Sequence, residues 1–251
     1  MAGHSKFKNI QHRKGAQDRK RAQLFAKLGR EITVSAKTGG GDPAMNARLR
    51  LAVANAKAAS MPRDNIEKAI QKGTGGGDMA NYVEMRYEGY GPGGVAIIID
   101  ALTDNKNRTA GDIRSIFTKN EGNLGESNSV SFMFDRVGEI IYPAQTAGAD
   151  DMFEAALEAG ASNVESDEEG HQITCTPDDF AAVRAGMVAK FGEPEKSGLA
   201  WKPNVMAPVG EEQARDVMEL IEALEDHDDV QVVTSNVDVS EQVMEKLMAA
   251  G

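Results

Sequence analysis

The residues with the clearest chemical role in this chain are basic side chains near its N-terminus. Five of them fall within a stretch of nine residues: Arg13, Lys14, Arg19, Lys20 and Arg21. Clustered lysine and arginine side chains neutralise phosphate groups, so this spacing indicates that the region binds a polyanion. The first fifteen residues contain no acidic side chain that would weaken such binding.

An aromatic residue lies inside the same stretch. Phe7 stands between Lys6 and Lys8, so its ring can stack on a base while the two lysines contact phosphates. We expect His4 and His12 to form hydrogen bonds with nucleic acid. The alternative is weak, nonspecific attraction, because phosphate contacts give affinity without sequence information. The candidate nucleic-acid-binding residues of this region are His4, Ser5, Lys6, Phe7, Lys8, Asn9, His12, Arg13, Lys14, Arg19, Lys20, Arg21, Lys27 and Arg30.

A second basic cluster lies in the middle of the chain, at residues 105–109. The sequence predicts that a helix begins near residue 106, and free backbone N–H groups at a helix start favour anions. Lys106 and Arg108 are therefore further candidates for nucleic-acid contact. The alternative is that the cluster only caps the helix and forms an exposed turn. The sequence favours the two interpretations equally.

Several catalytic and cofactor motifs are excluded by their context. The glycine-rich stretch 87–94 resembles a dinucleotide-binding loop, but a strand rather than a helix follows it, which predicts a tight turn. Residues 72–77 lack the Gly-Lys-Ser/Thr sequence of a phosphate-binding loop, and the chain has no Gly-x-Ser-x-Gly motif. We therefore expect no catalytic residues, no cofactor and no small-molecule substrate.

Metal binding is likewise not predicted. The four histidines and the single Cys175 show no ligand spacing, so we expect no metal site. We expect His171 and His227 to lie at the surface, and the acidic runs 167–169 and 225–229 to be solvated loops.

The charge of the chain is strongly segregated. Residues 1–72 contain 16 Lys and Arg against five Asp and Glu, a net charge of +11, whereas the whole chain carries −11. Residues 73–251 therefore carry −22. This pattern is typical of a protein that binds a polyanion through one end. One cysteine, no transmembrane-length apolar run and no secretory signal predict a cytoplasmic protein that does not enter membranes.

Residues 17–72 are predicted to form helices at 17–37, 43–59 and 62–72. Asp42 with Pro43 is typical of a helix start, and Met45 falls on the buried side of the second helix. Gly73 is predicted to end the third helix.

Beyond residue 78 the hydrophobic period changes from helical to mixed. Strands are predicted at 84–90 and 95–101 around a Gly-Pro-Gly-Gly turn, followed by a helix at 106–120 and a strand at 130–135. The next elements are a strand (139–142), a helix (150–159), two strands (163–167, 172–176), a helix (177–191) and a strand (198–202). This βαββαβ order is typical of the ferredoxin-like unit. A helix at 210–225 and a strand at 230–235 complete the series.

The predicted fold class is multidomain α+β, with a small helical domain followed by two ferredoxin-like α/β domains, the last inserted into the middle one. The insertion follows from counting elements, because 79–136 lacks a helix and a strand that 208–236 supplies. The predicted divisions are a basic flexible arm (1–16), a helical domain (17–72), a glycine-rich linker (73–78), a central α/β domain (79–136 plus 208–251) and an inserted domain (137–207).

Four blocks of residues resemble the YebC family, the YebC/PmpR-type regulators. The blocks are 3–6 with 9–18, 61–70, 87–96 with 102–109, and 122–125 with 129–134. The chain departs from the family pattern at Phe7, where Trp is usual, and at Asn128, where Gly is common; its acidic part, 138–251, matches loosely. The resemblance begins at the first residues of the chain. We therefore expect the arm to be part of the mature protein rather than a transit peptide, and the chain to be a bacterial-type cytoplasmic member of the family.

The resemblance implies a three-domain α/β protein without catalysis. The family is commonly described as DNA-binding transcriptional regulators, and its mitochondrial members are translational activators of cytochrome c oxidase. Bacterial members have been linked to ribosomes stalled on sequences such as proline runs. Two partners thus stay open: ribosomal RNA on the ribosome, or duplex DNA. The sequence favours RNA modestly, because no recognition helix is evident and residues 138–251, with a net charge of −19, repel a long duplex.

Overall fold

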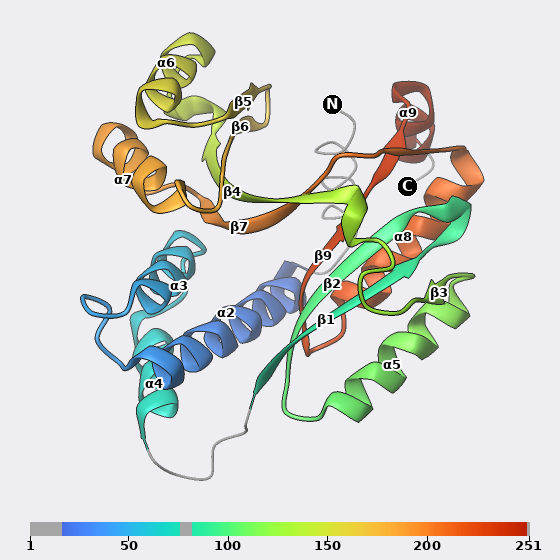
Figure 1. Cartoon of the computed structure of the whole chain (residues 1–251), viewed down its shortest axis with the longest axis horizontal. Helices are drawn as coiled ribbons and strands as arrows, with labels where there is room; N and C mark the ends of the chain where they lie inside the picture. The colour runs from blue at the N-terminus through green and yellow to red at the C-terminus, as the bar shows by residue number, and fades with distance from the viewer. Residues whose placement is uncertain (1–16, 76–81, 250–251) are drawn as a thin grey trace. The chain divides into compact units, whose positions relative to one another are not determined.

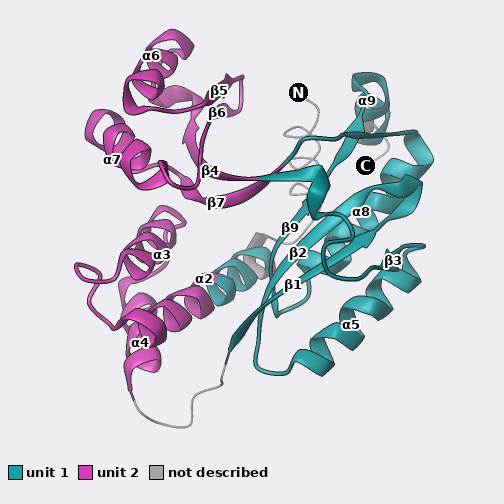
Figure 2. Ribbon diagram, in the orientation of Figure 1, with its two compact units in different colours: residues 1–27, 80–135, 203–251 teal, residues 28–79, 136–202 magenta. Residues whose placement is uncertain are grey.

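The computed structural model of this chain describes residues 17–75 and 82–249 (Figure 1). Contacts divide the chain into two compact units, coloured separately in Figure 2. Unit 1 comprises residues 1–27, 80–135 and 203–251, and unit 2 comprises residues 28–79 and 136–202. Each unit therefore combines segments that are distant in sequence. The finer division into five segments stays a prediction.

Helices make up the N-terminal part of the described chain, as predicted. They are α2 (Gln17–Gly39), α3 (Ala47–Ala58) and α4 (Arg63–Thr74). α2 is buried all round over five consecutive residues, Ile32 to Ala36. The buried residues of the other two helices recur at helical spacing and are Leu49, Ala52, Val53, Ala56, Ile66 and Ala69. No helix in the described residues combines the length and apolar content needed to cross a membrane.

The start of α3 differs from the prediction. Asp42 does not cap this helix: its carboxylate accepts a hydrogen bond from the Ala44 backbone N–H (2.9 Å) and forms a local turn. Asn46 is the cap, and Met45, predicted to be buried, is 85% exposed. The prediction was wrong because two residues of capping type lie four positions apart, and only tertiary contacts distinguish them.

Gly73 does not end α4, and this prediction too was wrong. It lies inside the helix and is buried where α4 crosses α2. A Cβ atom at this position would lie 2.5 Å from the Thr33 carbonyl oxygen and 2.7 Å from the Ala36 Cβ. The glycine is therefore required by the close approach of two helices rather than by a helix stop.

Unit 1 is organised around an antiparallel sheet of order β3-β1-β2-β9 in the described residues. The strands are β1 (Val83–Tyr90), β2 (Ala96–Thr103), β3 (Asn123–Leu124) and β9 (Val230–Ser235). β1 and β2 form the predicted hairpin, joined by the 3-10 turn η1 (Pro92–Gly94), with Tyr90 opposite Ala96. β9 pairs with β2, so segments separated by more than a hundred residues share one sheet.

Two helices cover one face of this sheet, α5 (Lys106–Lys119) and α8 (Glu211–Glu225). The core cluster contains Ile97 and Ile99 of β2, Phe117 of α5 and Leu220 of α8. A small parallel pair, β8 (Ala207–Val209) and β10 (Val237–Val239), and a helix, α9 (Glu241–Ala249), complete the unit.

Unit 2 contains the predicted βαββαβ unit. Its elements are β4 (Phe134–Pro143), α6 (Ala149–Ala159), β5 (Asn163–Ser166), β6 (Gly170–Cys175), α7 (Phe180–Phe191) and β7 (Lys196–Pro203). The strand order β5-β6-β4-β7 is that of a split βαβ fold. Ile140, Ile173, Met152 and Met187 form its core.

Two local predictions in this region were wrong. The strand predicted at 130–135 begins with a 3-10 turn, η2 (Ser131–Met133), and only its last two residues are strand, whereas the strand predicted at 139–142 is confirmed as part of the longer strand β4. His171, predicted at the surface, is only 3% exposed. Its Nε2 lies 3.1 Å from the Ala147 carbonyl oxygen, and its Nδ1 lies 2.8 Å from the Ser166 hydroxyl. These partners explain how a polar ring is accommodated in the interior.

Candidate nucleic-acid interface

Most of the predicted N-terminal site lies outside the described residues. This applies to the whole arm set His4, Ser5, Lys6, Phe7, Lys8, Asn9, His12, Arg13 and Lys14. The backbone of Arg19 lies in α2, but its side chain is also outside the description. The candidate residues that the structure places are therefore Lys20, Arg21, Lys27 and Arg30 on α2, and Lys106 and Arg108 on α5.

The basic side chains of α2 do not share one role. Arg21 is exposed, and its guanidinium carbon lies 5.3 Å from the centre of the Phe25 ring, a cation–π contact. Lys27 is half-buried, and its ammonium donates a hydrogen bond to the Glu225 carbonyl oxygen (2.7 Å) at the end of α8. A cation at a helix C-terminus stabilises that helix. Lys27 therefore has a structural partner within unit 1.

Some of the arginines near the helical core are paired with acids. Arg48 meets Glu31 through two contacts, of 2.8 and 3.1 Å, which is a bidentate pair. Arg63 contacts Glu67 at 2.6 Å within α4. These pairs cancel part of the positive charge counted in the sequence.

Three exposed lysines in this region have no acidic partner among the described residues. They are Lys57 in the last turn of α3, and Lys68 and Lys72 on α4. Lys68 and Lys72 are four residues apart, so they lie on the same face of the helix. We refer to them as the α4 lysine pair. Their charge is available to a phosphate backbone.

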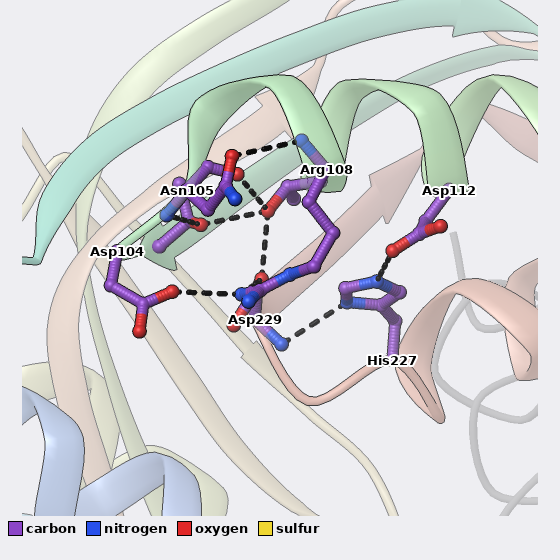
Figure 3. Close-up of polar contacts among 8 residues, drawn as sticks. Asp104, Asn105, Arg108, Asp112, His227 and Asp229 are labelled. Carbon is purple, nitrogen blue, oxygen red and sulfur yellow. Dashed lines mark hydrogen bonds and ion pairs between the residues drawn. The ribbon is translucent and has the colours of Figure 1, made fainter.

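The central cluster at the start of α5 forms a network of polar contacts, drawn in Figure 3. Asn105 is the N-cap, and its side chain accepts a hydrogen bond from the Arg108 backbone N–H (3.1 Å). The buried hydroxyls of Thr103 and Thr109 lie 2.7 Å apart. The capping interpretation of this cluster is therefore correct in its geometry, and Lys106 is left exposed.

Arg108 is the centre of this network. Its guanidinium contacts Asp104 at 2.8 Å and Asp229 at 2.9 Å. The hydrogen bond to Asp229 is the larger cause, and the one to Asp104 the next, of a pKa of Arg108 raised above its ordinary value. The charge of Arg108 is thus balanced by two carboxylates before any phosphate approaches.

Asp229 corrects the expectation that residues 225–229 form a solvated loop. It is 4% exposed, and its carboxylate accepts hydrogen bonds from Arg108 and from the Thr109 hydroxyl (2.7 Å). Its backbone N–H donates to Nδ1 of His227 (3.1 Å), so the ring proton is on Nε2, which faces Asp112 at 3.3 Å (Figure 3). Sequence reasoning missed this residue because its partners lie 120 positions away.

A second buried acid, Glu88, was also missed. It is 4% exposed, and its carboxylate accepts hydrogen bonds from the backbone N–H groups of Val130 (2.9 Å) and Ser131 (3.0 Å). The loop held in this way presents Phe132 with 69% of its surface exposed. Asn128 in the same loop has a φ of +67°, a left-handed conformation that Asn adopts more readily than most residues other than Gly.

Comparison with known proteins identifies the relatives of the chain. Residues 5–76 match the model of the TACO1/YebC protein N-terminal domain, and residues 82–237 match that of the TACO1/YebC second and third domain. The crystal structure of the conserved hypothetical protein Aq1575 from Aquifex aeolicus is 43% identical, with a TM-score of 0.83. The match covers 88% of this chain and 91% of that one. The chain belongs to the TACO1/YebC family.

Proposed function

We propose that this protein is a non-enzymatic regulator of gene expression that binds ribosomal RNA on the ribosome through residues 1–72, and thereby acts as a translation factor. The observation that carries the proposal is the segregation of charge, +11 in residues 1–72 against −22 in the rest. A basic segment binds RNA phosphates, while the acidic remainder limits nonspecific adhesion. This role implies a cytoplasmic location.

The pairing of acidic side chains in the helices supports the proposal. Glu31 and Glu67, two of the five acids of residues 1–72, are each paired with an arginine. The α4 lysine pair has no such partner in the described part of the chain. With Arg63 and Glu67 paired, the exposed charges left on α4 are those of Lys68, Lys72 and Asp64, a net charge of +1 that still favours a phosphate backbone.

A non-catalytic role is supported by the way the best catalytic candidates are engaged. Asp112, His227 and Asp229 resemble part of an acid–base relay, but Nδ1 of His227 already accepts the Asp229 backbone N–H. The Asp229 carboxylate is occupied by Arg108 and Thr109 rather than by the imidazole ring. These contacts stabilise the turn between α8 and β9, which gives the three side chains a structural role.

Duplex-DNA binding with transcriptional control is the second candidate, because the family is commonly labelled a transcriptional regulator. The charge of residues 138–251, a net −19, argues against a long duplex lying along the whole chain.

Ribosome co-sedimentation at physiological salt distinguishes the translation role from transcriptional control. The full-length chain is compared with a variant that lacks residues 1–21, with excess duplex DNA as competitor. We expect the full-length protein to pellet with ribosomes in the presence of DNA, and the shortened variant to stay in the supernatant. Removal of the protein from ribosomes by DNA, or tight duplex binding without pelleting, would refute the translation role and favour transcriptional control.

A further inference from the structure

The helix α6 of unit 2 carries two large apolar side chains on its outside. Phe153 is 53% exposed and Leu157 is 63% exposed, whereas Met152, Ala155 and Ala156 form the buried side of the same helix. Single exposed apolar residues are ordinary, but these two are four positions apart and therefore adjacent on the helix surface. They form one apolar strip.

The strip is directed away from the neighbouring helix. α6 meets α7 through Ala159, whose Cβ lies 3.0 Å from where a Cβ on Gly186 would be, and through Glu158, which contacts Lys190 at 3.9 Å. At 100° per residue, Phe153 and Leu157 fall on the side of α6 opposite to these two contacts. Figure 1 shows α6 next to α7 and beside β5 and β6.

Two acidic side chains lie along one side of the strip. Asp150 is three residues before Phe153, and Glu154 is three residues before Leu157, so each acid lies next to an apolar side chain. Both acids are exposed and have no basic partner among the described residues. Acids in the first turn favour helix formation, which accounts for Asp150 but not for Glu154 in the middle of α6. We call Asp150, Phe153, Glu154 and Leu157 the α6 patch.

We propose that the α6 patch binds a basic protein segment that carries apolar side chains. Phe153 and Leu157 supply the area that such a segment buries, and the two acids select lysine and arginine around it. Residues 137–202 carry 13 acidic and four basic residues, so a nucleic acid is repelled from this part of the chain. The proposal goes beyond the proposed function and does not depend on it.

The test uses the full chain and a defined probe, a fluorescent amphipathic peptide of about 18 residues with leucine on one face and lysine on the other. We expect the wild type to bind it by anisotropy, with affinity that falls as salt rises. The double variant Phe153→Ala with Leu157→Ala should lose about tenfold in affinity. Leu199→Ala is the matched control, because Leu199 is also exposed (48%) but lies on β7.

The acids are tested separately. Asp150→Asn with Glu154→Gln should weaken peptide binding about threefold and flatten its salt dependence. Asp178→Asn with Glu195→Gln makes the same change of charge elsewhere in unit 2. This control should leave the peptide affinity and its salt dependence unchanged. Binding of a single-stranded RNA probe should be the same for all variants, so failure of the proposed function would be visible independently.

Two results would overturn the proposal. In the first, the α6 variants bind the peptide as tightly as the wild type and the controls, which would make the attraction a property of net charge alone. In the second, analytical ultracentrifugation shows that the wild type self-associates and that Phe153→Ala with Leu157→Ala is monomeric, which would make a second copy the occupant.

Discussion

The side chain of Asn46 joins two helices, and its replacement should destabilise both. The residue is 7% exposed, its amide donates hydrogen bonds to the carbonyl oxygens of Ser35 (2.8 Å) and Gly40 (2.9 Å), and its oxygen accepts the Leu49 backbone N–H (3.0 Å). One side chain thus satisfies the end of α2 and the start of α3.

The loss of unfolding free energy expected for Asn46→Ala can be worked out from these contacts. Loss of an N-cap costs about 1 kcal/mol, and each of the two carbonyl oxygens left without its donor adds about 1 kcal/mol when water cannot replace it. Because Gly40 is exposed, water can replace the donor there, and the total should be about 2 kcal/mol. The loss falls on the helical part of unit 2, which includes the α4 lysine pair.

Asn46→Asp tests the reasoning more sharply. Asp is as good an N-cap as Asn in general, but here its carboxylate would face two carbonyl oxygens instead of donating to them. We expect Asn46→Asp to destabilise the helices at least as much as Asn46→Ala. Asn105→Asp at the start of α5 is the control, because there only the side-chain oxygen takes part in the cap contact.

Hydrogen exchange at the amide of Val53, a buried residue further along α3, measures the local free energy of opening in each variant, without requiring that the two units unfold together. The expected order of protection is wild type, then Asn46→Ala, then Asn46→Asp. An Asn46→Asp variant with wild-type protection at Val53 would refute the account, because it would mean that the two donated hydrogen bonds contribute nothing to stability.

Three further predictions concern charge, the Phe132 loop and pH. Lys68→Ala with Lys72→Ala should flatten the slope of log affinity for RNA against log salt by about 1.4, whereas an unchanged slope would remove α4 from the interface. Glu88→Ala should destabilise its loop by about 1–3 kcal/mol, because two backbone N–H groups lose their acceptor, and wild-type exchange at the Ser131 and Val130 amides would contradict this. Burial raises the pKa of Tyr142 to about 12, so an unfolded phenol ionises first and unfolding free energy falls by about 2 kcal/mol between pH 10 and 12. Tyr142→Phe should reduce that fall in urea titrations, and an identical fall would refute the assignment.

Local patterns in the sequence predict most of the fold. The Gly-Pro-Gly-Gly stretch predicts the β1–β2 hairpin, because a tight turn between two apolar runs brings them together as antiparallel neighbours. The alternation of periods over 139–202 predicts the split βαβ order of the sheet in unit 2. Element boundaries are less well determined: Asp42 and Asn46 are both of capping type, and the choice between them depends on two carbonyl groups of a different helix.

The buried acids show where sequence reasoning ends. Asp229 belongs to an acidic run that is typical of a solvated turn, and it is buried only because Arg108 and Thr109 approach from another element. Glu88 is adjacent to the hairpin turn, and it is buried because the backbone of residues 130 and 131 returns to it. Neither fact has a signal in local periodicity, because both depend on long-range contacts.

The same contacts change how the charge of residues 1–72 should be interpreted. The net charge of +11 counts every basic residue alike, yet Arg48 and Arg63 are paired with acids and Lys27 caps the end of α8. Pairing leaves only a few helical lysines available to phosphates, whereas the segment removed by deleting residues 1–21 holds seven basic residues and one acid. Each phosphate contact contributes about the same increment to affinity, so the larger share of any RNA binding must come from that segment. Under the proposed function the helices would mainly anchor this segment, so deleting residues 1–21 is a more sensitive test of RNA binding than substitutions on α4.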